Sequence, residues 1–406
     1  MLRKFSADYI FPVSSPPIQN GIVVTDEQGR ILEISAPSSP SPLLEERGAV
    51  QHFNGIIVPG FVNAHCHLEL SFLKNKIPEN KGLDEFILAI ETQRLANEED
   101  IFSAARDAEQ EMLSEGMVAV GDISNKNHSF GIKVKSDILF HTFIEVFGFH
   151  PARAEEVFNR GLILKGELER LDSKFIPIQL GQSSITAHAS YSASSQLLKK
   201  IRENAEAHNS VLTIHNQETE DENFLFQNKT GKILQRLEKF GIDTSFFVPT
   251  GKNSLSSVIP FLPKKNKIQL VHNTFTTETD IDKAIAHNKN IFWCFCPNAN
   301  LYIENRLPDI KMFYDKKLKC TIGTDSLASN YQLSVLEEMK TIQKKFPSIP
   351  LEEIIRWATL NGAELLGFNQ LLGSIEKNKT PGLVFISAVD LPSMLLTEKS
   401  KATRLI

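Results

Sequence analysis

Histidines and an aspartate stand at the ends of several short apolar runs in this sequence. In chain order they are His65 and His67, His188, His215, His272 and Asp325. Imidazole nitrogens and carboxylate oxygens are donors that bind divalent ions such as zinc and iron. If the apolar runs are neighbouring parallel strands, the residues that follow them meet at one edge of a sheet. The pattern therefore predicts a metal-centred hydrolytic site, with one position left for water.

His65 and His67 follow the apolar run 55–64. On a strand, side chains two residues apart point to the same side, so both imidazoles face one point. A single histidine at a strand end is more often a hydrogen-bonded core residue than a ligand. Because several strand ends carry such residues, the metal interpretation is favoured over the structural one.

Glu218 follows His215 by three residues. A carboxylate beside a metal site but not bound to the ion is suited to carrying a proton. The alternative is a surface charge within the acidic segment 218–222. We favour the catalytic interpretation because of the spacing from His215.

The elements that must position these residues are eight apolar, β-rich runs. They span 56–63, 117–122, 138–146, 177–187, 211–214, 268–271, 290–296 and 320–324. Amphipathic helical segments separate most of them, for example 83–114, 152–171, 193–207 and 331–345. Alternation of buried strands and helices indicates an α/β fold with a parallel sheet. Eight units favour a closed (β/α)8 barrel, the TIM barrel, whose active site lies at the carboxyl ends of the strands.

Both ends of the chain lack helical periodicity and contain short strand patterns. A hairpin is predicted over 21–34, and a similar pattern returns over 373–387. We therefore expect residues 1–57 and 367–406 to form one small, discontinuous β-sandwich domain. Residues 58–366 would form the barrel.

The interval 216–267 between two predicted strands is unusually long. Helices are expected over 224–240, and a flexible stretch over 250–254. In a barrel such an excursion leaves from the rim that carries the active site. It is either a lid over the substrate or an insertion without a catalytic role, and the sequence does not decide between them.

Composition narrows the class of protein and its partners. The 406 residues carry a net charge of −5, which argues against a nucleic-acid polymer as partner. No signal peptide is recognisable, and no apolar run approaches the roughly 20 residues that span a bilayer. The four cysteines form no Cys-x-x-Cys pair. We expect a cytoplasmic enzyme with a small-molecule substrate and no membrane partner; a homodimer is left open.

Several segments resemble the amidohydrolase superfamily. They are 59–69 (Pro-Gly-Phe-Val-Asn-Ala-His-Cys-His-Leu-Glu), 213–218 (Thr-Ile-His-Asn-Gln-Glu), 271–273 (Val-His-Asn), 323–326 (Gly-Thr-Asp-Ser) and 373–376 (Gly-Ser-Ile-Glu). Within that superfamily the pattern resembles the mononuclear aminohydrolases, which include nucleobase and nucleoside deaminases and triazine hydrolases. Residues 63–71 together with 323–330 are also similar to segments of 6-aminodeoxyfutalosine deaminases.

The resemblance implies a role for each candidate residue. His65, His67, His215 and Asp325 would hold one divalent ion per subunit, zinc or alternatively iron, since no lysine is placed to bridge a second ion. Glu218, His272 and Asp325 would handle the water and its protons. Glu69, His188, Asn300 and Ser326 would contact the substrate. For Glu69 a buried structural pairing with Arg or Lys is the alternative.

Together the residues and the resemblance imply hydrolytic deamination of a heteroaromatic, purine-like base or nucleoside, with release of ammonia. One alternative on the same scaffold is a hydrolase of a cyclic amide or a triazine. Another is a barrel without catalytic activity. The native substrate remains open.

Overall fold

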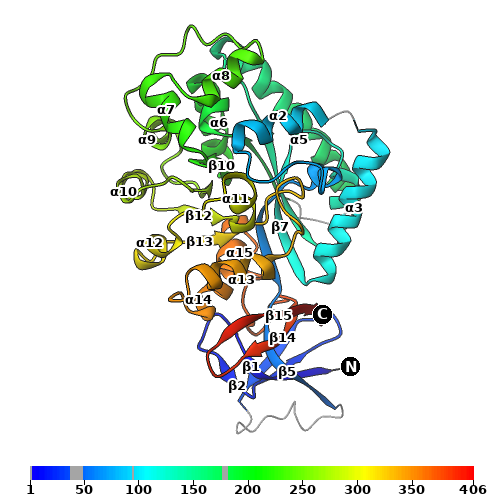
Figure 1. Ribbon diagram of the computed structural model, residues 1–406. Coiled ribbons are helices and arrows are strands. Elements are labelled where there is room, and N and C mark those ends of the chain that lie inside the picture. The colour runs from blue at the N-terminus through cyan, green and yellow to red at the C-terminus, as the bar shows by residue number, and fades with distance from the viewer. Residues whose placement is uncertain (1, 37–48, 94–95, 176–181) are drawn as a thin grey trace. The chain divides into compact units, whose positions relative to one another are not determined.

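The computed structural model describes residues 2–36, 49–93, 96–175 and 182–406 (Figure 1). The chain divides into two compact units. The first comprises 1–64, 110–120 and 334–406, and the second comprises 65–109 and 121–333. The domain boundaries at 57/58 and 366/367 remain a prediction, and residues 37–48 of the predicted β domain lie outside the described residues.

A seven-stranded sheet in the first unit joins strands from both ends of the chain. Its strands are β1 (Arg3–Ile10), β2 (Ile18–Gln19), β3 (Ile22–Thr25), β4 (Ile31–Ser35), β5 (Val50–Pro59), β14 (Leu383–Asp390) and β15 (Leu395–Arg404). The order is β15-β14-β5-β1-β3-β4, with β2 on β1. β1 and β5 are parallel, and β14 is antiparallel to β5. The predicted hairpin is confirmed as the antiparallel pair β3–β4.

Eight further strands form two four-stranded sheets. One has the order β6 (Phe61–Cys66), β7 (Met117–Ser124), β8 (Leu139–Val146), β9 (Gln182–Ala187), and the other β10 (Leu212–Asn216), β11 (Ile268–His272), β12 (Ile291–Phe295), β13 (Cys320–Ile322). The pairs within the second sheet, and β8 with β9, are parallel. Parallel isolated bridges join Cys66 to Asp325 and Ala189 to His215, so the edge strands of the two sheets also meet.

The first predicted run, 56–63, was wrong as a single strand, because it covers the end of β5 and the start of β6. The chain leaves one sheet for the next at Gly60, whose N–H bonds the carbonyl of Pro381 at 3.0 Å. A side chain at Gly60 would collide with this carbonyl, only 2.7 Å from the ideal Cβ position. Residues 177–181 of the fourth predicted run lie outside the described residues. The other runs are confirmed to within a few residues.

Helices follow most of the strands. The α-helices are α2 (Leu83–Gln93), α3 (Glu98–Ser114), α4 (Phe130–Lys133), α5 (Ala154–Phe175), α6 (Ser195–His208), α7 (Glu220–Asn228), α8 (Lys232–Lys239), α9 (Ser254–Val258), α10 (Glu278–His287), α11 (Pro297–Glu304), α12 (Ile310–Asp315), α13 (Val335–Lys345), α14 (Leu351–Ala358) and α15 (Leu360–Leu366). Short 3-10 helices are η1 (Leu68–Leu73), η2 (Pro151–Arg153), η3 (Ser190–Ser192) and η4 (Ile259–Phe261). None of the described helices combines the length and apolar character that a membrane span requires.

The interval after β10 contains α7, α8, α9 and η4. The helices predicted over 224–240 are confirmed as α7, which begins four residues earlier, and α8. Gly231 separates them with φ of 99°, a left-handed conformation that favours glycine. The left-handed turn at Gly231 changes the direction of the chain between α7 and α8.

Candidate metal centre and active site

The predicted donors converge within the second unit. The Nε2 atom of His67 lies 3.1 Å from that of His65 and 3.2 Å from that of His215. The Oδ1 atom of Asp325 is 3.3 Å from His67 Nε2. A further set of donor atoms, from His65, His215, His272 and Asp325, lies mutually within 4.8 Å. We call these five residues the donor cluster.

The backbone at the ends of the strands supports this convergence. His272 ends β11 with φ of 70°, Asp325 follows β13 with φ of 57°, and Gln217 follows β10 with φ of 46°. Left-handed conformations of non-glycine residues cost about 1–3 kcal/mol each and occur preferentially at functional sites. Hydrogen bonds from the backbone N–H groups of Thr324 and Asp325 to the His65 carbonyl, at 3.0 and 3.1 Å, hold the turn after β13 against β6.

The chemical state of the histidines fits a metal ion. All four histidines of the cluster are buried. Burial lowers the pKa of His65 and His67 well below the usual value, lowers that of His215, and brings that of His272 to about 3. Neutral imidazoles keep a lone pair for coordination, and Asp325 adds a carboxylate oxygen. Three nitrogens and one oxygen, so close together, are a donor set that suits zinc or iron.

The third nitrogen of this set, beside those of His65 and His215, could come from either His67 or His272. His67 Nε2 has direct short distances to three other donors, whereas His272 Nε2 is 3.6 Å from Oε1 of Glu218. This arrangement favours His67 as a ligand and leaves His272 beside the carboxyl group of Glu218.

Neighbouring groups orient the ligands. The Nδ1–H of His215 donates to the carbonyl of His188 at 2.9 Å, which leaves Nε2 directed at the cluster. The hydroxyl of Ser329 donates to Oδ2 of Asp325 and leaves Oδ1 for the cluster. Such contacts fix the ring orientation of ligating histidines and the position of ligating carboxylates.

Glu218 is held rigidly at the start of α7. The Glu222 carboxylate accepts hydrogen bonds from the backbone N–H groups of Gln217 at 3.1 Å and Glu218 at 2.8 Å. The hydroxyl of Ser190 donates to the same carboxylate at 3.0 Å. Burial, with the charges of Asp325 and Glu222, raises the pKa of Glu218 well above the usual value. Glu218 therefore favours its protonated form in the absence of an ion.

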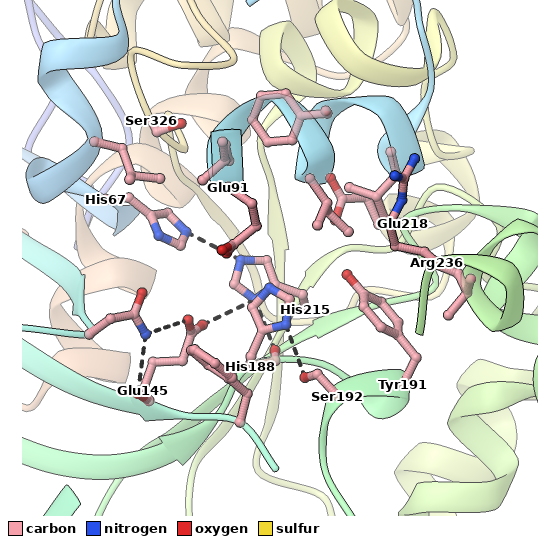
Figure 2. A pocket seen from close by; sticks show the side chains of 18 of the residues that line it. His67, Glu91, Glu145, His188, Tyr191, Ser192, His215, Glu218, Arg236 and Ser326 are labelled. Atoms are coloured by element: carbon pink, nitrogen blue, oxygen red, sulfur yellow. Dashed lines mark hydrogen bonds and ion pairs between the residues drawn. The ribbon is translucent and has the colours of Figure 1, made fainter. Parts of the chain in front are cut away.

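The donor cluster opens into a cavity of about 390 Å³ in the second unit (Figure 2). His67, His215, His272, Asp325 and Glu218 line one part of it. Apolar side chains of α2 and α8 and of the residues just after α8 line another: Leu83, Phe86, Ile87, Ile90, Ile233, Leu237, Phe240 and Ile242. We call α2 and α8 the helical wall. Cavities of this size and character bind small molecules.

The four predicted substrate contacts lie in two different environments. His188 and Ser326 line the cavity. Glu69 and Asn300 are buried and are absent from the described cavity lining. Oε2 of Glu69 accepts the backbone N–H groups of Asn125 at 3.1 Å and Lys126 at 3.2 Å, so this carboxyl group holds the loop after β7.

Asn300 lies behind His272 rather than in the cavity lining. Its Oδ1 atom is 3.5 Å from Nδ1 of His272, and its amide donates to the hydroxyl of Thr274. These contacts link α11 to the residues at the end of β11. The position of Asn300 is that of a residue that orients His272.

Four residues that line the cavity or support the site were not predicted from the sequence: Glu145, Tyr191, Glu222 and Arg236. Glu145 lies near the end of β8, and its Oε1 atom is 3.5 Å from Nδ1 of His215. Its position at the end of a predicted strand was an available signal. Arg236 lies on α8, where the sequence offers no motif that marks a site.

Residues 56–403 match the Amidohydrolase family. The chain belongs to this family. It is therefore a hydrolase that acts on carbon–nitrogen bonds, as the sequence predicted. The family match also covers both sheets that carry the donor cluster.

Three similar proteins are deaminases by name. The 5'-deoxyadenosine deaminase of Methanococcoides burtonii is 26% identical over 403 residues, covering 93% of this chain and 84% of that protein. The aminodeoxyfutalosine deaminase of Nitratiruptor sp. is 28% identical over 359 residues, covering 86% and 82%. The crystal structure of Helicobacter pylori aminofutalosine deaminase in complex with methylthio-coformycin has a TM-score of 0.82 at 22% identity and covers 100% of each chain.

Proposed function

We propose that this protein is a metal-dependent deaminase that replaces the amino group of a purine-like nucleoside by oxygen and releases ammonia. The observation that carries the proposal is the donor cluster with Glu218 beside it, at one side of a cavity large enough for a small molecule. The deaminase names of the two sequence relatives support it.

We infer that β6 to β13 close into one (β/α)8 barrel. The isolated bridges Cys66–Asp325 and Ala189–His215 connect the edges of the two four-stranded sheets, as a closed barrel requires. The strand order within each sheet follows the chain, which is typical of this architecture. We propose that residues 1–57 and 367–406, which precede and follow the barrel segment in the sequence, form the small β domain.

The ion would be held by His65, His67, His215 and Asp325, with zinc as the first choice and iron as the alternative. Such an ion would lower the pKa of a bound water and so supply the nucleophile. We propose one ion per subunit. A second group of candidate donors, Glu145, His188 and His215, shares His215 with the first, and Nδ1 of that ring is already engaged with the His188 carbonyl.

Glu218 and His272 would move the protons. A buried, protonated Glu218 can donate to the ring nitrogen next to the reacting carbon, and its carboxylate can then accept a proton from water. His272 Nε2, 3.6 Å from Glu218 Oε1, is placed to orient the attacking water. The departing amine receives a proton and leaves as ammonia, so the reaction consumes one water molecule.

The surroundings of these groups would position the substrate. His188 and Ser326 line the cavity and are proposed to contact it. We propose that Asn300 orients His272 and that Glu69 holds the loop after β7. A cytoplasmic location, a homodimer and the absence of nucleic-acid and membrane partners are proposals that rest on composition alone.

The decisive experiment is a screen of aminopurines, aminopyrimidines and their nucleosides with the zinc-loaded protein, measured by ammonia release. Turnover of an amino nucleoside is the expected result. Turnover of a cyclic amide or a triazine, without ammonia from any amino-heteroaromatic compound, would replace the proposal by the alternative hydrolase. Complete inactivity in a protein that binds the ion would leave only the non-catalytic barrel.

A further inference from the structure

The short helix η3 after β9 places one side of the cavity, and the polar side chains next to Tyr191 in it have partners. The Ser192 hydroxyl donates to the Ala189 carbonyl at 3.1 Å, and its oxygen accepts from the Ala189 N–H at 3.0 Å. The same oxygen is 3.0 Å from Nδ1 of His188. Ser190 is bonded to Glu222. The backbone around Tyr191 is therefore fixed.

Tyr191 differs from its neighbours Ser190 and Ser192 in its hydrogen bonding. Its side chain lines the cavity and is only 5% exposed. Its ring packs edge-on against the imidazole of His188, with centroids 5.7 Å apart (Figure 2). Yet its hydroxyl has no hydrogen-bond partner among the described residues. Buried polar groups are nearly always paired, so a hydroxyl left unpaired in a cavity indicates a partner from a ligand or ordered water.

The charges around Tyr191 define what that partner can be. Burial and the carboxyl groups of Glu218, Glu222 and Glu145 raise the pKa of the Tyr191 hydroxyl well above its usual value. The hydroxyl therefore keeps its proton and can donate it in a hydrogen bond. These acidic surroundings disfavour an anionic partner, because each carboxyl group that is ionised would repel it, which leaves an uncharged nitrogen or oxygen acceptor.

We propose that the Tyr191 hydroxyl donates a hydrogen bond to an uncharged acceptor atom of the bound substrate and so contributes to substrate binding and selection. The inference rests on the proposed deaminase function. The acceptor is a ring nitrogen or a sugar oxygen, which share the required chemistry. Tyr191 would act by binding and orienting the substrate, whereas Glu218 and His272 carry its protons.

The test compares Tyr191→Phe with Tyr302→Phe. Tyr302 is also buried, but its hydroxyl donates to the Ile77 carbonyl at 2.6 Å, and it is absent from the described cavity lining. In the zinc-loaded enzyme, Tyr191→Phe should lower kcat/KM for adenosine about tenfold without lowering Tm, because no bond within the protein is lost. Tyr302→Phe should lower Tm and leave kcat/KM unchanged.

Adenine as a second substrate separates the two acceptors. A loss confined to adenosine assigns the bond to the sugar, and an equal loss with both compounds assigns it to the ring; either result supports the proposal. A Tyr191→Phe variant with unchanged kcat/KM for both compounds overturns it. So does a lower Tm with unchanged kinetics, since that marks a structural hydroxyl.

A wild-type enzyme that releases ammonia from neither compound would contradict the proposed function instead. Calorimetric binding of purine riboside, an uncharged nucleoside without an amino group, then decides the role of Tyr191. Weaker binding to Tyr191→Phe than to wild type supports the assignment. Equal affinity, or no binding to wild type, overturns it.

Discussion

The donor cluster and the helical wall border the same cavity but are built in different ways. The donors follow strands whose backbones are hydrogen-bonded to their neighbours and whose residues are buried. The wall consists of two helices joined by charged side chains: Arg236 lies 3.1 Å from Asp84 and 3.4 Å from Glu85, and Lys232 lies 3.7 Å from Asp84. We infer from this difference that the residues at the strand ends determine the reaction, while the helices determine which molecule reaches the donor cluster.

The largest effect is expected when the donor cluster loses a ligand. His215→Ala removes a nitrogen that lies 3.2 Å from His67 Nε2, so the variant should bind no stoichiometric ion and lose all measurable activity. Metal content by mass spectrometry and ammonia release check both results. His208→Ala, an exposed histidine on α6, is the matched control and should keep one ion per subunit. An active, ion-loaded His215→Ala would remove His215 from the proposed ligand set.

The next effect separates proton transfer from metal binding. Glu218→Gln keeps the size of the side chain but cannot carry a proton, so kcat should fall about 10²–10⁴-fold with full metal content. Rates measured alongside metal content distinguish this outcome from ligand loss. A variant within tenfold of the wild-type rate would rule out Glu218 as the proton carrier.

The sequence predicted the donor cluster better than the wall for a physical reason. Strand ends of a parallel sheet meet at one edge, so a histidine after each apolar run is placed by the fold itself, as for His215 and His272. Residues on the wall are placed by the packing of α8, within the interval 216–267, against α2 from another part of the chain. Arg236 therefore carries no local signal, although helices were expected in its part of the chain.

The position of the side chain two residues after His67 was also not predictable from the sequence. Glu69 follows His67 by two residues, which suggested the same orientation toward the substrate. The chain turns into η1 at Leu68, however, and the periodicity of a strand no longer applies. The carboxyl group of Glu69 consequently contacts the loop after β7.

The helical wall is tested by Arg236→Met. The variant removes the ion pairs between α8 and α2 but keeps an apolar stem of similar length, so the two helices should separate more easily. We expect KM for the preferred nucleoside to rise about tenfold, with kcat within threefold and metal content unchanged. Steady-state kinetics and metal analysis measure these quantities.

Asp84→Asn and the double variant sharpen this result. If Arg236 acts through Asp84, the second change should add little to the first, because both remove one interaction. Additive effects on KM would instead show that Arg236 contacts the substrate independently of α2. A large loss of kcat would contradict the separation between wall and donor cluster.

The smallest effect is expected at Glu69, which lies beside the donor cluster but outside the described cavity lining. Burial raises the pKa of this carboxyl group to about 8, so the folded protein holds it protonated near neutral pH, and Glu69→Gln imitates that state. An acid with a raised pKa in the folded state stabilises the fold below its unfolded pKa of about 4, and this contribution is lost as pH rises through about 8. The Tm of Glu69→Gln should therefore match wild type at pH 4 and exceed it at pH 9, with KM changed less than twofold. Thermal unfolding at the two pH values measures the first result and kinetics the second. If KM instead rises well beyond twofold while Tm stays normal, Glu69 contacts the substrate. His67 and Glu69, which follow His65 at intervals of two residues, would then both serve the reaction.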